Sequence, residues 1–179
     1  DHMLQGHLIL NVIYSNLPSE QLDSIARYQR SKEVITILKQ AWNDDFIDIQ
    51  SEFYNLHLPT APGKPYQQKG GPMLYFGGYS PEGIALCTEH CDVYLMMWPE
   101  TREKLKIQME TVSARVATYH RILDFGLRVH VIVRETEEDA GQYADQLISK
   151  LDVEKGPRIR ERAQDAKSQG VYKQGEMRA

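Results

Sequence analysis

The feature that most limits the possible folds is a regular alternation of apolar runs of strand length with helical segments. The apolar runs occupy residues 8–13, 73–76, 93–98 and 125–133. The helical patterns that follow them occupy about residues 25–42, 81–90, 99–119 and 136–151. Apolar strands joined by helices are typical of a parallel sheet covered by helices. The predicted fold class is therefore α/β.

The remaining segments set the domain organisation. Residues 46–49 and 53–54 suggest a short hairpin, and residues 58–66 read as an extended, proline-rich connector. Residues 152–179 are polar and charged, with little apolar face. We therefore predict one structured unit over residues 1–151 and a polar tail or mobile flap over residues 152–179.

Two architectures accommodate four such strand–helix units: an open, doubly wound sheet and a (β/α)8 barrel. The Gly-x-Gly-x-x-Gly signature of dinucleotide-binding open sheets is absent from the sequence, which disfavours the first. Four units make half of a barrel, so the prediction is a partial (β/α)8 barrel, with open sheet edges that favour self-association.

Composition excludes several classes of partner. The net charge of −4 over 179 residues gives no basic footprint for a nucleic acid. The longest apolar runs are far too short to span a bilayer, so we expect a soluble protein that does not bind membranes. The polar end and the start directly before an apolar strand suggest a piece of a longer protein.

Two cysteines, Cys87 and Cys91, lie four residues apart on one predicted helix, with His90 between them. This spacing is poor for a disulfide and suggests a reducing compartment. Buried helix residues are favoured over a metal site, because no second group of ligands lies nearby.

The turn after the second strand has the pattern of a phosphate-binding loop. Gly77 and Gly78 end the apolar run, Ser80 is a natural helix cap, and Pro81 begins the helix. Two glycines allow a sharp turn and a close backbone approach, and a helix N-terminus attracts anions. The alternative is an ordinary strand-to-helix turn in which Ser80 only caps its own helix.

A second candidate site lies on the last strand. Alternation places Arg128 and His130 on one face, and a row of aliphatic residues, Leu127, Val129, Val131 and Val133, on the helix-facing side. Arg128 could hold an anionic substrate group, and His130 could orient it or move a proton. The alternative is a structural ion pair beside a core histidine. Asn11, inside the first apolar run, also needs a polar partner or a ligand.

Several stretches resemble the bacterial luciferase-like flavin monooxygenases, most closely the alkanesulfonate monooxygenase branch. The similar residues are 1–12, Arg27 and Tyr28, 74–80, 92–95 and, most specifically, 125–136. The resemblance implies strands four to seven of a (β/α)8 barrel, followed by the start of the active-site insertion. It also implies reduced FMN from a separate reductase and conversion of an organosulfur substrate such as an alkanesulfonate to an aldehyde and sulfite.

Carried over by position, the resemblance assigns Tyr28, Gly78, Tyr79 and Ser80 to the FMN phosphate and Asn11 to the flavin ring. Arg128 and His130 would face flavin and substrate as catalytic residues. Tyr79 and Tyr14 replace smaller residues of the sulfonate branch, so another organosulfur compound is an alternative substrate. A deazaflavin-dependent oxidoreductase and a non-catalytic flavin-binding protein are alternative functions. A cytoplasmic homo-oligomer is expected.

Overall fold

The computed structural model describes residues 1–13, 22–67, 70–97, 101–150 and 155. Within these residues a parallel sheet carries its strands in the order β1–β4–β5–β6. These strands are β1 (Ile9–Val12), β4 (Met73–Phe76), β5 (Val93–Met97) and β6 (Asp124–Arg128). The α-helices are α1 (Ser24–Asn43), α2 (Pro81–His90), α3 (Arg102–Ala117) and α4 (Glu137–Ser149). The predicted α/β fold with four parallel strand–helix units is confirmed.

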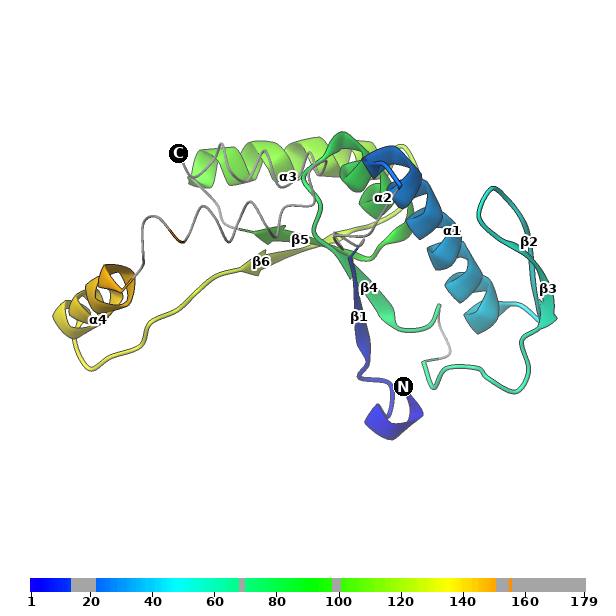
Figure 1. Ribbon diagram of the computed structural model, residues 1–179, viewed down its shortest axis with the longest axis horizontal. Coiled ribbons are helices and arrows are strands. Elements are labelled where there is room, and N and C mark those ends of the chain that lie inside the picture. Colours follow the sequence, from blue (N-terminus) through cyan, green and yellow to red (C-terminus); the bar gives the residue numbers. More distant parts are fainter. Residues whose placement is uncertain (14–21, 68–69, 98–100, 151–154, 156–179) are drawn as a thin grey trace.

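Among the described residues, helices cover one face of the sheet, and the other is called the helix-free face below. Figure 1 shows α1, α2 and α3 side by side over this face, whereas α4 stands apart at the end of an extended segment. A short 3₁₀ helix, His2–Leu4, precedes β1. No helix in the described part of the chain has the length and apolar character needed to cross a membrane.

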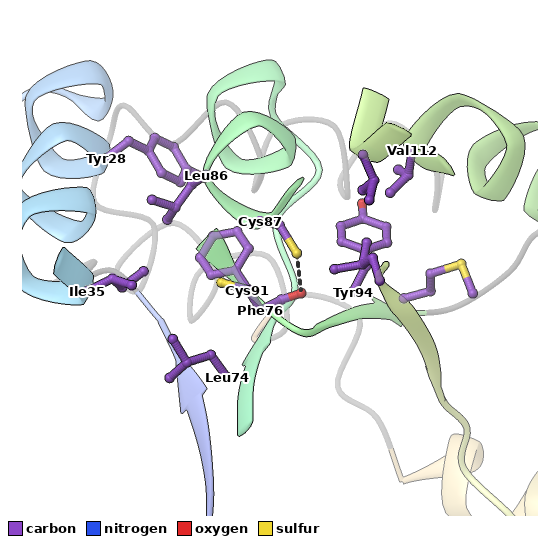
Figure 2. Packing of buried hydrophobic residues seen from close by; sticks show 12 residues of the cluster. Tyr28, Ile35, Leu74, Phe76, Leu86, Cys87, Cys91, Tyr94 and Val112 are labelled. Atoms are coloured by element: carbon purple, nitrogen blue, oxygen red, sulfur yellow. Dashed lines mark hydrogen bonds between the residues drawn. The ribbon is translucent and has the colours of Figure 1, made fainter. Parts of the chain in front are cut away.

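The core fills the space between the sheet and these three helices (Figure 2). Leu74 and Phe76 of β4 and Tyr94 and Met96 of β5 all point to this side, because alternate strand residues share a face. The helices contribute buried side chains that pack against them: Tyr28, Ile35, Leu86, Cys87, Val112 and Val116.

The opposite face carries the other set of alternating residues. The strand register places Asn11 beside Tyr75, and Leu95 beside Gly126. Arg128, which pairs with Met97, lies on this face too, because it is two residues beyond Gly126 along β6. Because the strands are parallel, their carboxyl ends meet at one edge of the sheet, which is where α/β folds place their sites.

The predicted hairpin exists, but its second arm is β3 (Asn55–Pro59), after β2 (Phe46–Gln50). Residues 53–54, predicted as strand, belong to the turn, which Glu33 of α1 holds. The Glu33 carboxylate accepts hydrogen bonds from Ser51 Oγ (2.7 Å) and the Phe53 amide (3.0 Å). Burial raises the pKa of Glu33, but these hydrogen bonds outweigh it and lower the pKa overall.

Helix α1 packs through a different stripe from the one expected. The expected apolar positions began with Val34, which is 36% exposed, whereas Ile35 is fully buried. Tyr28, Ile35 and Trp42, spaced seven residues apart, face the core or pack against it. A spacing of seven residues is about two helical turns, so these three side chains lie along one side of α1, with an aromatic residue at each end.

Strand β6 is shorter than predicted. It ends at Arg128, opposite Met97 at the end of β5, so residues 129–133 have no neighbouring strand among the described residues to extend the ladder. The aliphatic row expected against helices is exposed: Leu127 by 44%, and Val129, Val131 and Val133 by more. The expected helix start at residues 99–100 and most of the polar tail, 152–179, lie outside the described residues, as does Tyr14.

Candidate functional site

The turn between β4 and α2 brings together three of the residues predicted to hold a phosphate. Ser80 is the N-cap of α2 and its Oγ accepts a hydrogen bond from the Gly83 amide at 3.1 Å. The same oxygen donates to the hydroxyl of Tyr28 at 3.0 Å. Ser80 is fully buried and Tyr28 is 5% exposed. The helix cap and the proposed ligand group are therefore one oxygen atom, and Gly78 adjoins this pair.

Glycine is required in this turn because neighbouring atoms leave no space for a Cβ atom. Neither Gly77 nor Gly78 has a positive φ, so a left-handed backbone is not the reason for glycine at these positions. A Cβ on Gly77 would lie 2.8 Å from the carbonyl oxygen of Leu95. A Cβ on Gly78 would lie 2.6 Å from the Phe76 ring. On α2, a Cβ on Gly83 would lie 2.8 Å from the Tyr28 hydroxyl. Close packing thus holds this turn against the sheet.

Tyr94 of β5, which is not among the residues predicted for a site, also contacts this turn. Its hydroxyl donates to the carbonyl oxygen of Gly78 at 2.9 Å and accepts from Nε2 of Gln108 on α3 at 2.9 Å. Burial, followed by its electrostatic interaction with Tyr79, raises the pKa of Tyr94, so the phenol stays protonated. A phenol inside an apolar run must find a polar partner, and this was the available signal.

The turn has the properties of an anion site. At the start of α2, Pro81 has no N–H and the Gly83 N–H bonds to Ser80, so only the amides of Ser80 and Glu82 are without an acceptor in the helix. The helix dipole places positive potential there. Two buried hydroxyl groups, of Tyr28 and Ser80, lie at this helix end and are hydrogen-bonded to each other. Tyr79, half-buried, lies between Gly78 and Ser80. Hydroxyl groups at a helix N-terminus are groups of the kind that can hold a phosphate.

The remaining predicted residues lie on or beyond the helix-free face. Asn11 of β1 is exposed and neighbours Tyr75. Arg128, at the carboxyl end of β6, is exposed. His130 lies two residues beyond the end of β6, so strand alternation does not place it beside Arg128. Because β5 lies between β4 and β6, the backbone at Arg128 is two strand spacings, about 10 Å, from β4.

The Cys-His-Cys cluster is part of the core. Cys87 is buried within α2, and Cys91 is buried as its C-cap rather than inside the helix. Hydrogen bonding with Cys91, together with burial, raises the pKa of Cys87, which keeps it an unreactive thiol. Burial lowers the pKa of His90 to about 4. Among the described residues, no group of three or more His, Cys, Asp or Glu could hold a metal ion.

Comparison with known proteins gives one family. The model of the family described as luciferase-like monooxygenase matches residues 1–178. A sulfoquinovose monooxygenase of Agrobacterium fabrum is 54% identical over 99% of this chain and 46% of its own length. A second sulfoquinovose monooxygenase, from Novosphingobium aromaticivorans, is 45% identical over 97% of this chain and 47% of its own length. The chain therefore spans about half the length of these relatives.

Solved structures share the fold at low sequence identity. An EDTA monooxygenase from Chelativorans sp. BNC1 superposes with a TM-score of 0.73 at 12% identity, covering 84% of this chain and 42% of its own. A long-chain alkane monooxygenase superposes with a TM-score of 0.66 at 19% identity, covering 78% of this chain and 39% of its own. A riboflavin lyase, solved with modified FMN and riboflavin, superposes with a TM-score of 0.69 at 15% identity, covering 81% of this chain and 39% of its own. Each aligns through about two fifths of its chain, in agreement with a partial barrel.

Proposed function

Because this chain belongs to the luciferase-like monooxygenase family, we propose that it supplies the FMN phosphate site and a substrate-binding arginine to a sulfonate-cleaving monooxygenase. The observation that carries the proposal is the hydroxyl pair of Tyr28 and Ser80 at the N-terminus of α2. Amides, hydroxyls and the helix dipole together suit a phosphate dianion. The flavin ring would then extend along the helix-free face, where Asn11 lies.

The substrate is proposed from the relatives and from charge. Two relatives at 54% and 45% identity are named sulfoquinovose monooxygenase, so a sulfonated sugar is the first candidate. Arg128 lies at the carboxyl edge of the same face, and a guanidinium can bind two sulfonate oxygens at once. His130, next to this edge, would move a proton during the reaction.

The proposed reaction is an oxidative C–S cleavage. When bound, reduced FMN supplies two electrons and activates O₂; a separate flavin reductase would provide it. One oxygen atom goes to the substrate carbon, which becomes an aldehyde, and the other leaves as water, while the C–S bond breaks and sulfite departs. Arg128 holds the sulfonate in place while charge shifts onto it, which lowers the barrier electrostatically.

The test is sulfite release from sulfoquinovose. Because the chain spans about half of its relatives, it replaces the matching segment of the Agrobacterium fabrum relative in a chimera. The assay contains FMN, NADH and a flavin reductase. Arg128→Ala should lower the turnover about 100-fold, and Arg102→Ala, a change of an exposed arginine on α3, should leave it within about twofold. Full turnover by Arg128→Ala, or a folded, flavin-bound chimera that releases no sulfite, would contradict the proposal.

A further inference from the structure

The hydrogen bonds of the turn point to a residue that prepares the phosphate site without touching the ligand. We propose that Tyr94 is a positioning residue that orients the backbone of the β4–α2 turn through the carbonyl group of Gly78. This inference rests on the proposed function, because it assumes that the turn holds the phosphate of FMN.

The contacts form a chain from α3 to the turn. Nε2 of Gln108 donates to the Tyr94 hydroxyl at 2.9 Å, and the hydroxyl donates to the Gly78 carbonyl oxygen at 2.9 Å. Because the Tyr94 oxygen accepts the hydrogen bond from Gln108, the single hydroxyl proton of Tyr94 is directed to Gly78. Figure 2 shows Tyr94 standing between β5 and α3. The ring is fully buried and packs edge-on against Phe125, with ring centroids 6.4 Å apart.

The bond to Gly78 fixes a peptide plane. In a trans peptide, the carbonyl of one residue and the amide N–H of the next point in opposite directions. When the Gly78 carbonyl points to Tyr94, the N–H of Tyr79 points away from the core. The same bond keeps a carbonyl oxygen, which would repel an anion, on the buried side. Tyr94 therefore favours a turn that presents a donor rather than an acceptor to a phosphate.

A purely structural role for the hydroxyl would stabilise the fold and affect all ligands equally. A positioning role acts on the phosphate alone. FMN and riboflavin share the same ring and differ in the phosphate, so the ratio of their dissociation constants isolates its contribution. Tyr94→Phe removes the hydroxyl and keeps the ring that packs on Phe125.

The experiment measures the dissociation constants of the chain for FMN and riboflavin by flavin fluorescence. Tyr94→Phe should weaken FMN binding roughly three- to tenfold and leave riboflavin binding within about twofold. Gln108→Met, which leaves Tyr94 in place, should give a smaller change in the same direction. Tyr119→Phe, which removes a partly exposed hydroxyl beyond α3, should change neither constant.

The outcomes separate the inference from its premise. If the unchanged chain binds FMN no tighter than riboflavin, or binds neither, the proposed phosphate site is wrong, and the role of Tyr94 falls with it. If the unchanged chain prefers FMN, but Tyr94→Phe and Gln108→Met keep that preference, the phosphate site stands and the inference about Tyr94 is wrong. Equal weakening of both flavins would also overturn it, because that result reports a structural role.

Discussion

A single oxygen atom, Oγ of Ser80, caps α2 and bonds to Tyr28 of α1. The two roles that the sequence left as alternatives, helix cap and ligand group, are therefore compatible. Buried hydroxyls at such a position link the fold to the site, since a change in one alters the other.

Ser80→Ala should lower the free energy of unfolding by about 2 kcal/mol, because it removes both a cap and a buried hydrogen bond. Thr101→Ala removes only the cap at the exposed start of α3, where the Thr101 side chain accepts a hydrogen bond from the Lys104 amide. This change should cost about 1 kcal/mol. Urea denaturation measures both. A Ser80→Ala cost no larger than that of Thr101→Ala would show that the bond to Tyr28 contributes nothing.

His90 should make the fold sensitive to acid. Burial lowers its pKa to about 4, against an unfolded value near 6.5. Lys32, Lys39 and Arg121 add to the shift, and Glu89 opposes it. Between these two pH values the unfolded chain binds the proton and the folded chain does not. The stabilisation is complete above pH 6.5 and is lost as the pH falls towards 4.

The measurement is the urea midpoint at several pH values between 7 and 4. His90→Gln should flatten the loss of stability over that range. His57→Gln, a change of an exposed histidine in the hairpin, should leave the slope as it was. An unchanged slope in His90→Gln would exclude His90 as its source.

At the scale of elements, helix α2 is fixed at both ends. Its N-terminus is held by Ser80, and its C-terminal carbonyls accept hydrogen bonds from Arg121 (to Thr88 and Cys91) and Lys39 (to His90). Cations suit the negative end of the helix dipole. The helix whose N-terminus forms the proposed phosphate site is therefore held between α1 and the chain before β6.

Two helical glycines should respond oppositely to alanine. Alanine normally favours a helix by up to about 1 kcal/mol over glycine. On α4, nothing lies within 4 Å of a Cβ at Gly141, so Gly141→Ala should increase the helical circular dichroism signal. On α2, Gly83→Ala meets the Tyr28 hydroxyl at 2.8 Å and should destabilise the fold by about 1–3 kcal/mol. Stabilisation by Gly83→Ala would show that Tyr28 moves aside at no cost.

The elements themselves were largely readable from the sequence. Helix α2 has the predicted bounds because Ser80 and Pro81 are strong local start signals. Strand β6 was overestimated, since alternation continues to Val133 while pairing with β5 stops at Arg128. The alternation of apolar residues indicates that a segment can form a strand, but the length of the strand depends on pairing with its neighbour.

The candidate site was only partly readable. Tyr28 and Ser80 are 52 residues apart, and the family resemblance assigned both to one phosphate site. Their hydroxyls are hydrogen-bonded at 3.0 Å, and their role in holding a phosphate stays a prediction. Tyr94 was missed, because its role depends on a carbonyl from another strand and an amide from α3. Such tertiary hydrogen bonds leave no periodic trace in the sequence. The roles of Arg128 and His130 stay predictions.

At the scale of the whole molecule, an apolar surface follows β6. It consists of exposed side chains before and within α4: Leu127, Val129, Val131, Val133, Tyr143, Leu147 and Ile148. Exposed apolar surface beside a sheet edge promotes association. This surface is the physical basis for expecting a homo-oligomer.

The mass of the chain should therefore rise with concentration in light-scattering measurements. Val131→Lys combined with Leu147→Lys should shift it towards the monomer, because charge on both halves of this surface opposes contact. Ile107→Lys, which changes an equally exposed residue of α3, should leave the association as it was. A monomer at every concentration would refute this expectation.

The central claim is that the β4–α2 turn holds the phosphate of FMN, and ³¹P NMR spectroscopy of FMN tests it most directly. We expect the phosphate resonance to shift when the chain is added, to return towards its free position with Ser80→Ala, and to stay shifted with Ser113→Ala, a change on the exposed side of α3. Quenched flavin fluorescence with a phosphate resonance still at its free position would show that the flavin binds elsewhere, and would contradict the claim.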